Sequence, residues 1–237
     1  MTVGGPAALF ARKYRRELFP ATPLLFAAMD QQYLGGAQLG ENETAVAVVN
    51  DLPRLIDDIL RVLPETRQVF IVSGSGAIAR FRRPEVETGF ARFRDRVTFV
   101  WSDGMSLSEI LDRVANLPAH SAIVYQTFST DAQGASYTAE QVIAGLRARG
   151  NAPLFAAQSP YLGRGIVGGS MMNIDDLARR TADVASRILN GEPPGELRVP
   201  PQLSGPPIFD WRELQRWGIP ESRLPLGSVV QFRPPSL

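Results

Sequence analysis

The chain has 237 residues and a mass of 25.9 kDa, which suffices for one large domain or for two smaller lobes with separate cores. Its 25 Lys and Arg residues nearly balance its 24 Asp and Glu residues, so it lacks the basic excess typical of nucleic-acid binding. It has no cysteine, and His120 is the only histidine. This composition excludes thiol catalysis, disulfides, iron–sulfur clusters and metal sites with two histidines.

The sequence also disfavours two further classes of protein. Lys13 is the only lysine, which argues against a Schiff-base enzyme. The sequence contains no apolar run of about 18 residues, the length that spans a membrane as a helix. The amino terminus also lacks the basic-then-apolar layout of a secretion signal, so an exported form would need a signal outside this sequence.

Apolar runs and helical periodicity predict an alternation of strands and helices along the chain. A first helix, 7–19, is expected to end at Pro20. Further helices are predicted at 52–63, 77–93 with an interruption at Pro84, 106–117, 138–149 and 174–189. Strands are predicted at 23–29, 45–49, 68–72, 97–101, 121–125, 153–157 and 166–172. Residues 192–207 are rich in proline and predict an extended crossover, followed by a short helix at 209–217 and an apolar run at 229–232.

The alternation over residues 68–190 predicts an α/β fold, in which parallel sheets carry helices on both faces. We expect two lobes. Residues 53–195 are predicted to form a carboxyl-terminal α/β lobe, and residues 1–52 with 196–237 a partial amino-terminal lobe and crossover.

A glycine-rich turn offers one enzymatic interpretation. Gly74-Ser75-Gly76 and Ala79 form a G-x-G-x-x-A pattern between a strand and a helix, where backbone N–H groups can hold a phosphate. Asp103 follows the next strand, where a ribose-binding acid would lie. The alternative function is therefore an NAD-type dinucleotide-dependent enzyme. Against it, Pro84 falls inside the helix, and a small-residue turn ends strands in many α/β folds.

The remaining catalytic candidates have simpler explanations. His120 lies in a predicted loop, and no G-x-S-x-G elbow is present for a serine hydrolase. The adjacent pairs Asp57-Asp58 and Asp175-Asp176 are placed near helix starts, where negative charge is favourable.

Polar and aromatic side chains gather at the predicted carboxyl ends of the strands, which is where open parallel sheets bind ligands. This set suits reversible capture of a small molecule, because rings give apolar contact and amides fix orientation. Polar loop ends without a function are the alternative for each residue. The predicted ligand-binding residues are Asp30, Gln31, Tyr33, Ser73, Ser75, Asp103, Gln126, Phe128, Gln158 and Tyr161. No catalytic residue and no metal ligand is predicted.

Four stretches resemble a known family. They are LFPATPLLFAAMD (18–30), LPETRQVFIVSGSG (63–76), YLGRGIVGG (161–169) and FDWRELQRWGIPESRLPLGSVVQFR (209–233). They are similar to ABC-transporter substrate-binding-like proteins with a type I periplasmic-binding fold. The version they resemble most is used as the extracytoplasmic sensor region of bacterial membrane histidine kinases.

The resemblance implies a two-lobed, periplasmic receptor that holds a ligand between its lobes and signals by closure. The ligand-binding residues above carry over by position rather than by an invariant motif. Family members usually have a strand–helix–strand–helix segment before the LFP-x-TP stretch, so the amino-terminal lobe is expected to be incomplete here. An incomplete sheet leaves an open edge through which a homo-oligomer could form.

Three functions remain open on the sequence. The first is a non-enzymatic receptor without a cofactor, whose partners are a small organic ligand and a membrane kinase or a permease. Its ligand is expected to be neutral or weakly acidic, with Arg164 either pairing a carboxylate or facing solvent. The second is the dinucleotide-dependent enzyme. The third is a folded remnant without a working cleft.

Overall fold

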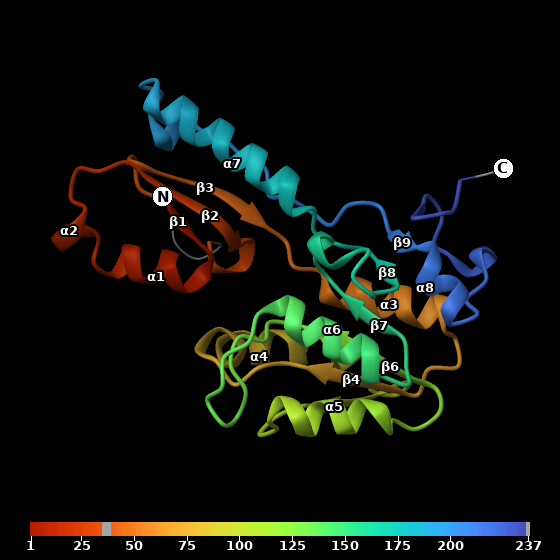
Figure 1. Ribbon diagram of the computed structural model, residues 1–237. Helices are drawn as coiled ribbons and strands as arrows, with labels where there is room; N and C mark the ends of the chain where they lie inside the picture. The colour runs from red at the N-terminus through yellow and green to blue at the C-terminus, as the bar shows by residue number, and fades with distance from the viewer. Residues whose placement is uncertain (35–38, 236–237) are drawn as a thin grey trace. The chain divides into compact units, whose positions relative to one another are not determined.

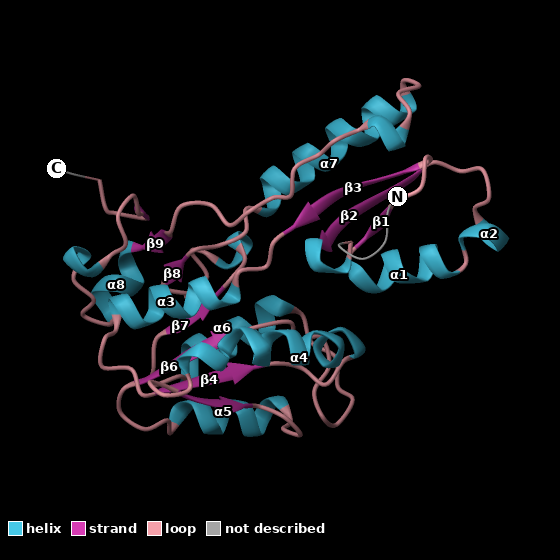
Figure 2. Ribbon diagram, turned by 180° about the vertical axis from the view of Figure 1, so that it is seen from behind, coloured by secondary structure: helices cyan, strands magenta, loops and turns pink. Residues whose placement is uncertain are grey.

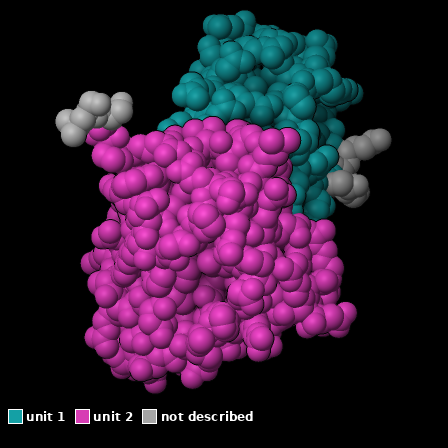
Figure 3. Space-filling view, turned by 90° about the vertical axis from the view of Figure 1, so that its right-hand side faces the viewer, with its two compact units in different colours: residues 1–51, 172–204 teal, residues 52–171, 205–237 magenta. Residues whose placement is uncertain are grey.

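The computed structural model describes residues 1–34 and 39–235, and these divide into two compact units (Figure 3). Unit 1 comprises Met1–Asp51 and Met172–Ser204, and unit 2 comprises Leu52–Met171 and Gly205–Leu237. Each unit is an α/β structure with a parallel sheet and helices on both of its faces, as predicted.

The division differs from the predicted one at two places. The helix at 174–189 belongs to unit 1, because Leu177 and Val184 pack with Leu25 and Val46 of the unit 1 sheet. The carboxyl-terminal segment belongs to unit 2, because Phe209 and Leu214 are fully buried in the core of that unit. Assignment by position along the chain therefore placed both segments in the wrong unit. The unit to which each segment belongs is determined by the apolar residues it packs against.

Unit 1 is built on three parallel strands in the order β1-β2-β3, with helices packed on both faces (Figure 1). Its central strand reads Leu-Leu-Phe-Ala-Ala-Met, an apolar run typical of a strand buried on both faces. Phe26 and Met29 face a cluster with Ala8 and Ala11 of α1, and Leu25 faces the side covered by α7. The elements are β1 (Thr2–Val3), α1 (Gly5–Lys13), α2 (Arg15–Leu18), β2 (Leu24–Asp30), β3 (Glu43–Val48) and α7 (Ile174–Leu189).

A bulge in β2 reverses the alternation of its side chains. The register with β3 shifts between Ala27 and Met29, and Ala28 has a positive φ of 53°. One extra residue brings Met29 onto the face of Phe26 and leaves Asp30 at the carboxyl end of the strand.

Unit 2 is built on four parallel strands in the order β5-β4-β6-β7 (Figure 2). Val69 and Ile71 face the core shared with α3 and α4, whereas Phe70 and Val72 face the core shared with α5 and α6. The elements are α3 (Leu52–Val62), β4 (Gln68–Val72), α4 (Ala77–Phe90), β5 (Thr98–Trp101), α5 (Leu107–Ala115), β6 (Ser121–Tyr125), α6 (Ala139–Arg149) and β7 (Leu154–Ala156).

Helix α4 is continuous through Pro84, so the predicted interruption there is wrong. The helix runs through Pro84 to Phe90, although a proline inside a helix costs about 3 kcal/mol. Val86 and Phe90, which follow the proline, are both buried in the unit 2 core. Burial of these two side chains offsets the missing backbone hydrogen bond, which local propensity alone does not capture.

The carboxyl-terminal part of unit 2 forms a small mixed sheet in the order β10-β9-β8. The predicted strand at 166–172 shrinks to two glycines, and the predicted helix at 209–217 begins as a strand. At Gly168 a Cβ atom would lie 2.1 Å from the Ile208 carbonyl oxygen, so only glycine allows this approach. The elements are β8 (Gly168–Gly169), β9 (Ile208–Asp210), α8 (Trp211–Arg216) and β10 (Val229–Gln231). In the described part of the chain, no helix is both long and apolar enough to cross a bilayer.

Candidate ligand-binding site

The carboxyl edge of the unit 2 sheet has the topology of a ligand-binding site. The chain leaves β4 toward β5 on one side, and returns to place β6 on the other side. The connections that follow β4 and β6 therefore diverge, and such a switch point is where open α/β sheets hold ligands. The two connections are residues 73–76 and 126–138, and the first part of the second one, 126–130, lies at the switch point.

At this switch point the glycine turn is joined to the loop after β6. The Gly74 N–H donates to the Thr127 carbonyl at 3.0 Å, and the Ser75 N–H donates to the Thr130 carbonyl at 2.8 Å. A Cβ atom at Gly74 would lie 2.8 Å from the Thr130 oxygen. Glycine is thus required here because a protein loop approaches closely, and these two amides are engaged by the protein itself. The geometry does not support the dinucleotide interpretation of this turn.

The serine hydroxyls of the same turn point to a different use. Ser73 and Ser75 are half-buried, and in the described part of the chain their hydroxyl groups have no hydrogen-bond partner. The neighbouring Ser102 is buried and clamps β4 to β5, because its Oγ accepts from the Ser73 N–H and donates to the Ser73 carbonyl, both at 2.9 Å. The backbone is therefore fixed while two hydroxyls remain available to a ligand.

Asp103 is held by an arginine that the sequence did not single out. Arg83 of α4 donates to both Asp103 carboxylate oxygens, at 2.6 and 2.7 Å, and its Nε donates to Glu87 at 2.8 Å. The guanidinium group also lies 3.5 Å from the centre of the Trp101 ring. Asp103 is thus neutralised by Arg83, which removes it as a free ribose-binding acid. Because Arg83 and Asp103 are twenty positions apart in the chain, no local sequence pattern indicated that they pair.

Gln126 and Phe128 follow β6 but lie in different surroundings. The Gln126 N–H donates to the Val72 carbonyl at 2.9 Å, and its side-chain Nε2 is buried without a partner among the described residues. Phe128 is only 3% exposed and lies in the core with Tyr137, at 6.2 Å between ring centres. Phe128 is therefore a core residue, although the sequence placed it among the predicted ligand-binding residues. Gln126 keeps the character expected of a ligand-orienting amide.

The loop after β6 is anchored by a carboxylate that the sequence analysis missed. Asp131 is buried and accepts hydrogen bonds from the Leu107, Gln133 and Ala135 N–H groups and from the Tyr137 hydroxyl. Burial alone would raise the pKa of Asp131, but these bonds together hold that pKa below its ordinary value. Asp131 fixes the shape of the loop that faces Gly74.

At the end of β7, Tyr161 packs against Tyr125 rather than standing alone. The two rings meet edge to face, with their centres 5.3 Å apart. Burial raises the pKa of both phenols, so both are neutral at physiological pH. Gln158 is half-buried at the start of the same turn. Arg164 is paired with Glu140 at 3.0 Å, so it is not a free partner for a ligand carboxylate.

The three predicted residues of unit 1 lie together at the carboxyl end of β2. One Asp30 oxygen accepts from the Gln32 N–H at 3.1 Å, and the other accepts from Asn50 at 2.8 and 3.3 Å. Asp30 therefore caps the turn that carries Gln31 and Tyr33. Gln31 is exposed, and Tyr33 is half-buried against the α1 side of the sheet.

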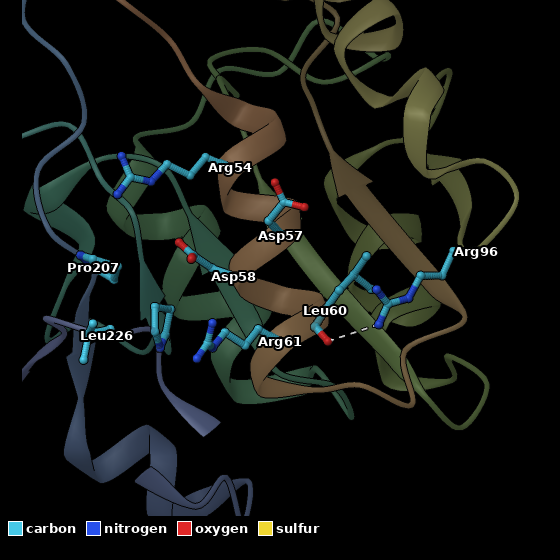
Figure 4. A pocket seen from close by; sticks show the side chains of 9 residues that line it. Arg54, Asp57, Asp58, Leu60, Arg61, Arg96, Pro207 and Leu226 are labelled. Carbon is cyan, nitrogen blue, oxygen red and sulfur yellow. Dashed lines mark hydrogen bonds between the residues drawn. The ribbon is translucent and has the colours of Figure 1, made fainter. Parts of the chain in front are cut away.

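Three cavities of unit 2 lie elsewhere. One of about 440 Å³ lies on the flank of α3, one of about 540 Å³ lies at the amino-terminal edge of the sheet beside His120, and one of about 420 Å³ lies along β5. Figure 4 shows the first, in which Asp58 lies between the side chains of Arg54 and Arg61. Asp58 accepts from the Ser170 N–H at 2.6 Å, and its burial raises its pKa. Among the described residues, no cluster of histidine and acidic side chains could hold a metal ion.

Comparison with known proteins gave matches only among solved structures. No protein-family model and no curated protein matches the sequence. The ABC domain in complex with L-Trp from Streptococcus pneumonia matches with a TM-score of 0.67 and 18% identity, over 96% of this chain and 77% of that one. A conserved domain protein from Vibrio cholerae matches with a TM-score of 0.65 and 19% identity, over 97% and 77% of the two chains.

A third match is the ligand-free, open form of a substrate binding protein with adhesive properties from Clostridium difficile. Its TM-score is 0.63 at 15% identity, over 97% of this chain and 76% of that one. This chain has a periplasmic-binding-like fold. The match confirms the fold class that the four sequence stretches implied. Within this fold, the strand order of unit 2 places the switch point at Ser73–Gly76 and Gln126–Thr130.

Proposed function

We propose that this chain is a non-enzymatic domain that captures a small organic molecule at the carboxyl ends of its strands. The observation that carries the proposal is a group of polar atoms at the unit 2 switch point that have no hydrogen-bond partner among the described residues, namely the Ser73 and Ser75 hydroxyls and the Gln126 amide nitrogen. A buried amide without a partner is costly, and a ligand that accepts its hydrogen bond would recover that cost. The L-Trp complex of one structural neighbour supports a ligand of amino-acid size.

The expected ligand is neutral or zwitterionic rather than strongly anionic. Arg83 and Arg164, which lie at this edge, are each paired with a carboxylate, and Arg80 donates to the Ser75 carbonyl. A ligand carboxylate would have to compete with Asp103, Glu140 or that carbonyl for these guanidinium groups. Hydroxyl and amide groups instead favour a ligand that both donates and accepts hydrogen bonds.

The finer parts of the proposal concern the response to binding. We propose that the ligand engages the strand ends of both units and that its preference for the closed arrangement shifts an open–closed equilibrium. A shift from mostly open to mostly closed needs about 5.5 kcal/mol of differential affinity. The domain is proposed to act outside the cytoplasm and to pass its signal to a membrane kinase or its ligand to a permease. Self-association through the β1 edge of unit 1 also belongs to this proposal.

A thermal-shift screen tests the proposal directly. The panel contains amino acids, small organic acids, sugars and NAD(H), and a ligand at 100 times its Kd should stabilise the fold by about 2.7 kcal/mol. The expected hit is an amino-acid-sized molecule, and its affinity should fall at least tenfold in the variant S73A/Q126L. The control variant H120A changes the opposite edge of the sheet and should bind as the wild type does.

Two outcomes would contradict the proposal. A response to NAD(H) alone would favour the dinucleotide enzyme. Stabilisation by a small molecule that S73A/Q126L binds as tightly as the wild type would move the site away from the switch point.

Closure is tested separately by small-angle X-ray scattering. The radius of gyration should be smaller when the ligand saturates the protein, and an unchanged radius would count against closure.

A further inference from the structure

One edge of the unit 2 sheet is covered and the other is not. At the β7 edge, the Val167 N–H donates to the Leu154 carbonyl at 2.7 Å, so a following segment covers part of that edge. At the opposite edge, β5 pairs only with β4 among the described strands. In the described part of the chain, no loop backbone is hydrogen-bonded to the outer side of Thr98–Trp101. An unpaired edge of this kind is a template for another strand.

The open edge is lined by stacked aromatic rings. Phe99 and Trp101 alternate onto the α4 face of the sheet, where Phe90 lies 4.7 and 6.3 Å from their ring centres. Both edge rings are only partly buried. A hollow of about 420 Å³ runs along them, and its lining comprises Glu87, Phe90, Arg94, Val97, Thr98, Phe99 and Trp101.

The two ends of this hollow carry opposite charge. At the Trp101 end, a single guanidinium group, that of Arg83, lies between the carboxylates of Glu87 and Asp103, which leaves an excess of one negative charge. Towards the Thr98 end, Arg94 lines the hollow and forms no ion pair in the described part of the chain. Asp95, the next residue, does not line it. A second copy of this edge that runs in the opposite direction would therefore place opposite charges against each other.

We propose that β5 pairs antiparallel with β5 of a second copy of this chain, about a two-fold axis that passes through Val100. This inference stands apart from ligand binding. A two-fold axis perpendicular to the sheet keeps each face on the same side, so opposite residues must have the same parity in the strand. Phe99 then lies opposite Trp101 of the second copy, and the same pair recurs across the axis. Aromatic pairs of this kind are among the favourable cross-strand neighbours.

The same operation pairs the charges. It brings Arg94 of each copy toward the end that holds Glu87 and Asp103 of the other copy. The dimer would thus join the two unit 2 sheets into one of eight strands, with aromatic rings at its centre and an ion pair on each side. Because the edge strand has only four residues, we expect an equilibrium that depends on protein concentration.

Cysteine cross-linking tests the register, since the chain has no cysteine of its own. In V100C the two sulfur-bearing residues face each other across the axis, within the 4.4–6.8 Å that a disulfide allows between Cα atoms. In T98C, an exposed position on the same strand, the two introduced cysteines are four positions apart along the paired strands. This separates them by about 13 Å in the strand direction. We expect mild oxidation to give a covalent dimer of V100C and at most a trace for T98C.

Charge reversal provides an independent test that needs no change in the strand. Sedimentation should show a dimer of the wild type, a dissociation constant at least tenfold higher for R94E, and recovery of most of the affinity in R94E/E87R. A monomeric wild type at the highest soluble concentration would overturn the proposal. So would equal cross-linking of V100C and T98C, or an R94E variant that dimerises as the wild type does.

Discussion

The guanidinium group of Arg83 lies 3.5 Å above the Trp101 ring while it bridges the carboxylates of Asp103 and Glu87. The contact ties α4 to the carboxyl end of β5. An exposed ion pair contributes about 0–1 kcal/mol, so the stacking on the ring is expected to supply much of the stabilisation. We predict that R83M lowers the free energy of unfolding by about 1–2 kcal/mol. Arg149, which pairs with Asp112 at the surface and stacks on no ring among the described residues, is the control. R149M should change stability by less than about 0.5 kcal/mol in urea unfolding, and equal losses would contradict the stacking argument.

The two glycines of the turn after β4 should respond differently to alanine. At Gly74 the added Cβ would meet the backbone oxygen of Thr130 at 2.8 Å, and backbone cannot move aside easily. At Gly76 the nearest atom is the Ser129 hydroxyl at 3.1 Å, which can rotate away. We predict a loss of about 1–3 kcal/mol for G74A and clearly less for G76A, measured by chemical unfolding. Equal losses of stability for the two variants would contradict this steric account.

Asp58 should destabilise the fold at neutral pH. Its folded-state pKa is raised by burial above the unfolded value of 3.8, so the carboxylate carries a cost that is fully present above the raised pKa. Below pH 3.8 both states are protonated and the cost disappears. D58N keeps an oxygen that can accept from the Ser170 N–H. The variant is therefore predicted to gain stability relative to the wild type at about pH 7 and to lose that gain as the pH falls to about 3.5. A gain that does not change with pH would contradict this account.

Asp131 should show the opposite pH dependence. Its folded-state pKa is lowered, since the hydrogen bonds to its carboxylate outweigh the effect of burial. The ionised group therefore stabilises the fold above the unfolded pKa of 3.8, and this contribution is lost as the pH falls through the lowered pKa. We predict that D131N is less stable than the wild type at about pH 7 and that the difference shrinks below about pH 3.8. Unfolding curves at several pH values measure the difference, and a constant gap would show that geometry rather than charge matters.

The sequence predicted the centre of unit 2 well because its signals are local. Val69–Val72 is a continuous apolar run between a polar start and Ser73, and β4 occupies the predicted residues. The capping boxes Ser106/Glu109 and Thr138/Gln141 begin α5 and α6 where the predicted helices start. Elements fixed by long-range packing were less predictable, as at β9, where Ile208–Asp210 is a strand because it pairs with Gly168 and Val230.

The candidate site was predictable as a place but not in its details. Position after a strand identified Ser73, Ser75 and Gln126, which remain candidates for ligand contact, and the Gln126 Nε2 is buried without a partner among the described residues. The same reasoning could not separate Phe128, which turns into the core, from a residue of the surface. Nor could it find Arg83, whose partner Asp103 lies 20 positions away, or the bond from the Leu107 N–H to Asp131, which spans 24 positions.

The discontinuity of unit 1 has a consequence during synthesis. Its sheet and α1 are complete after about fifty residues, but α7, which covers one face of that sheet, is translated only after the 120 residues of Leu52–Met171. Leu25 and Val46 are thus without their helical cover while the first part of unit 2 leaves the ribosome. Such a nascent chain exposes an apolar surface until α7 has been translated, and a chaperone that binds apolar surfaces would be expected to bind it.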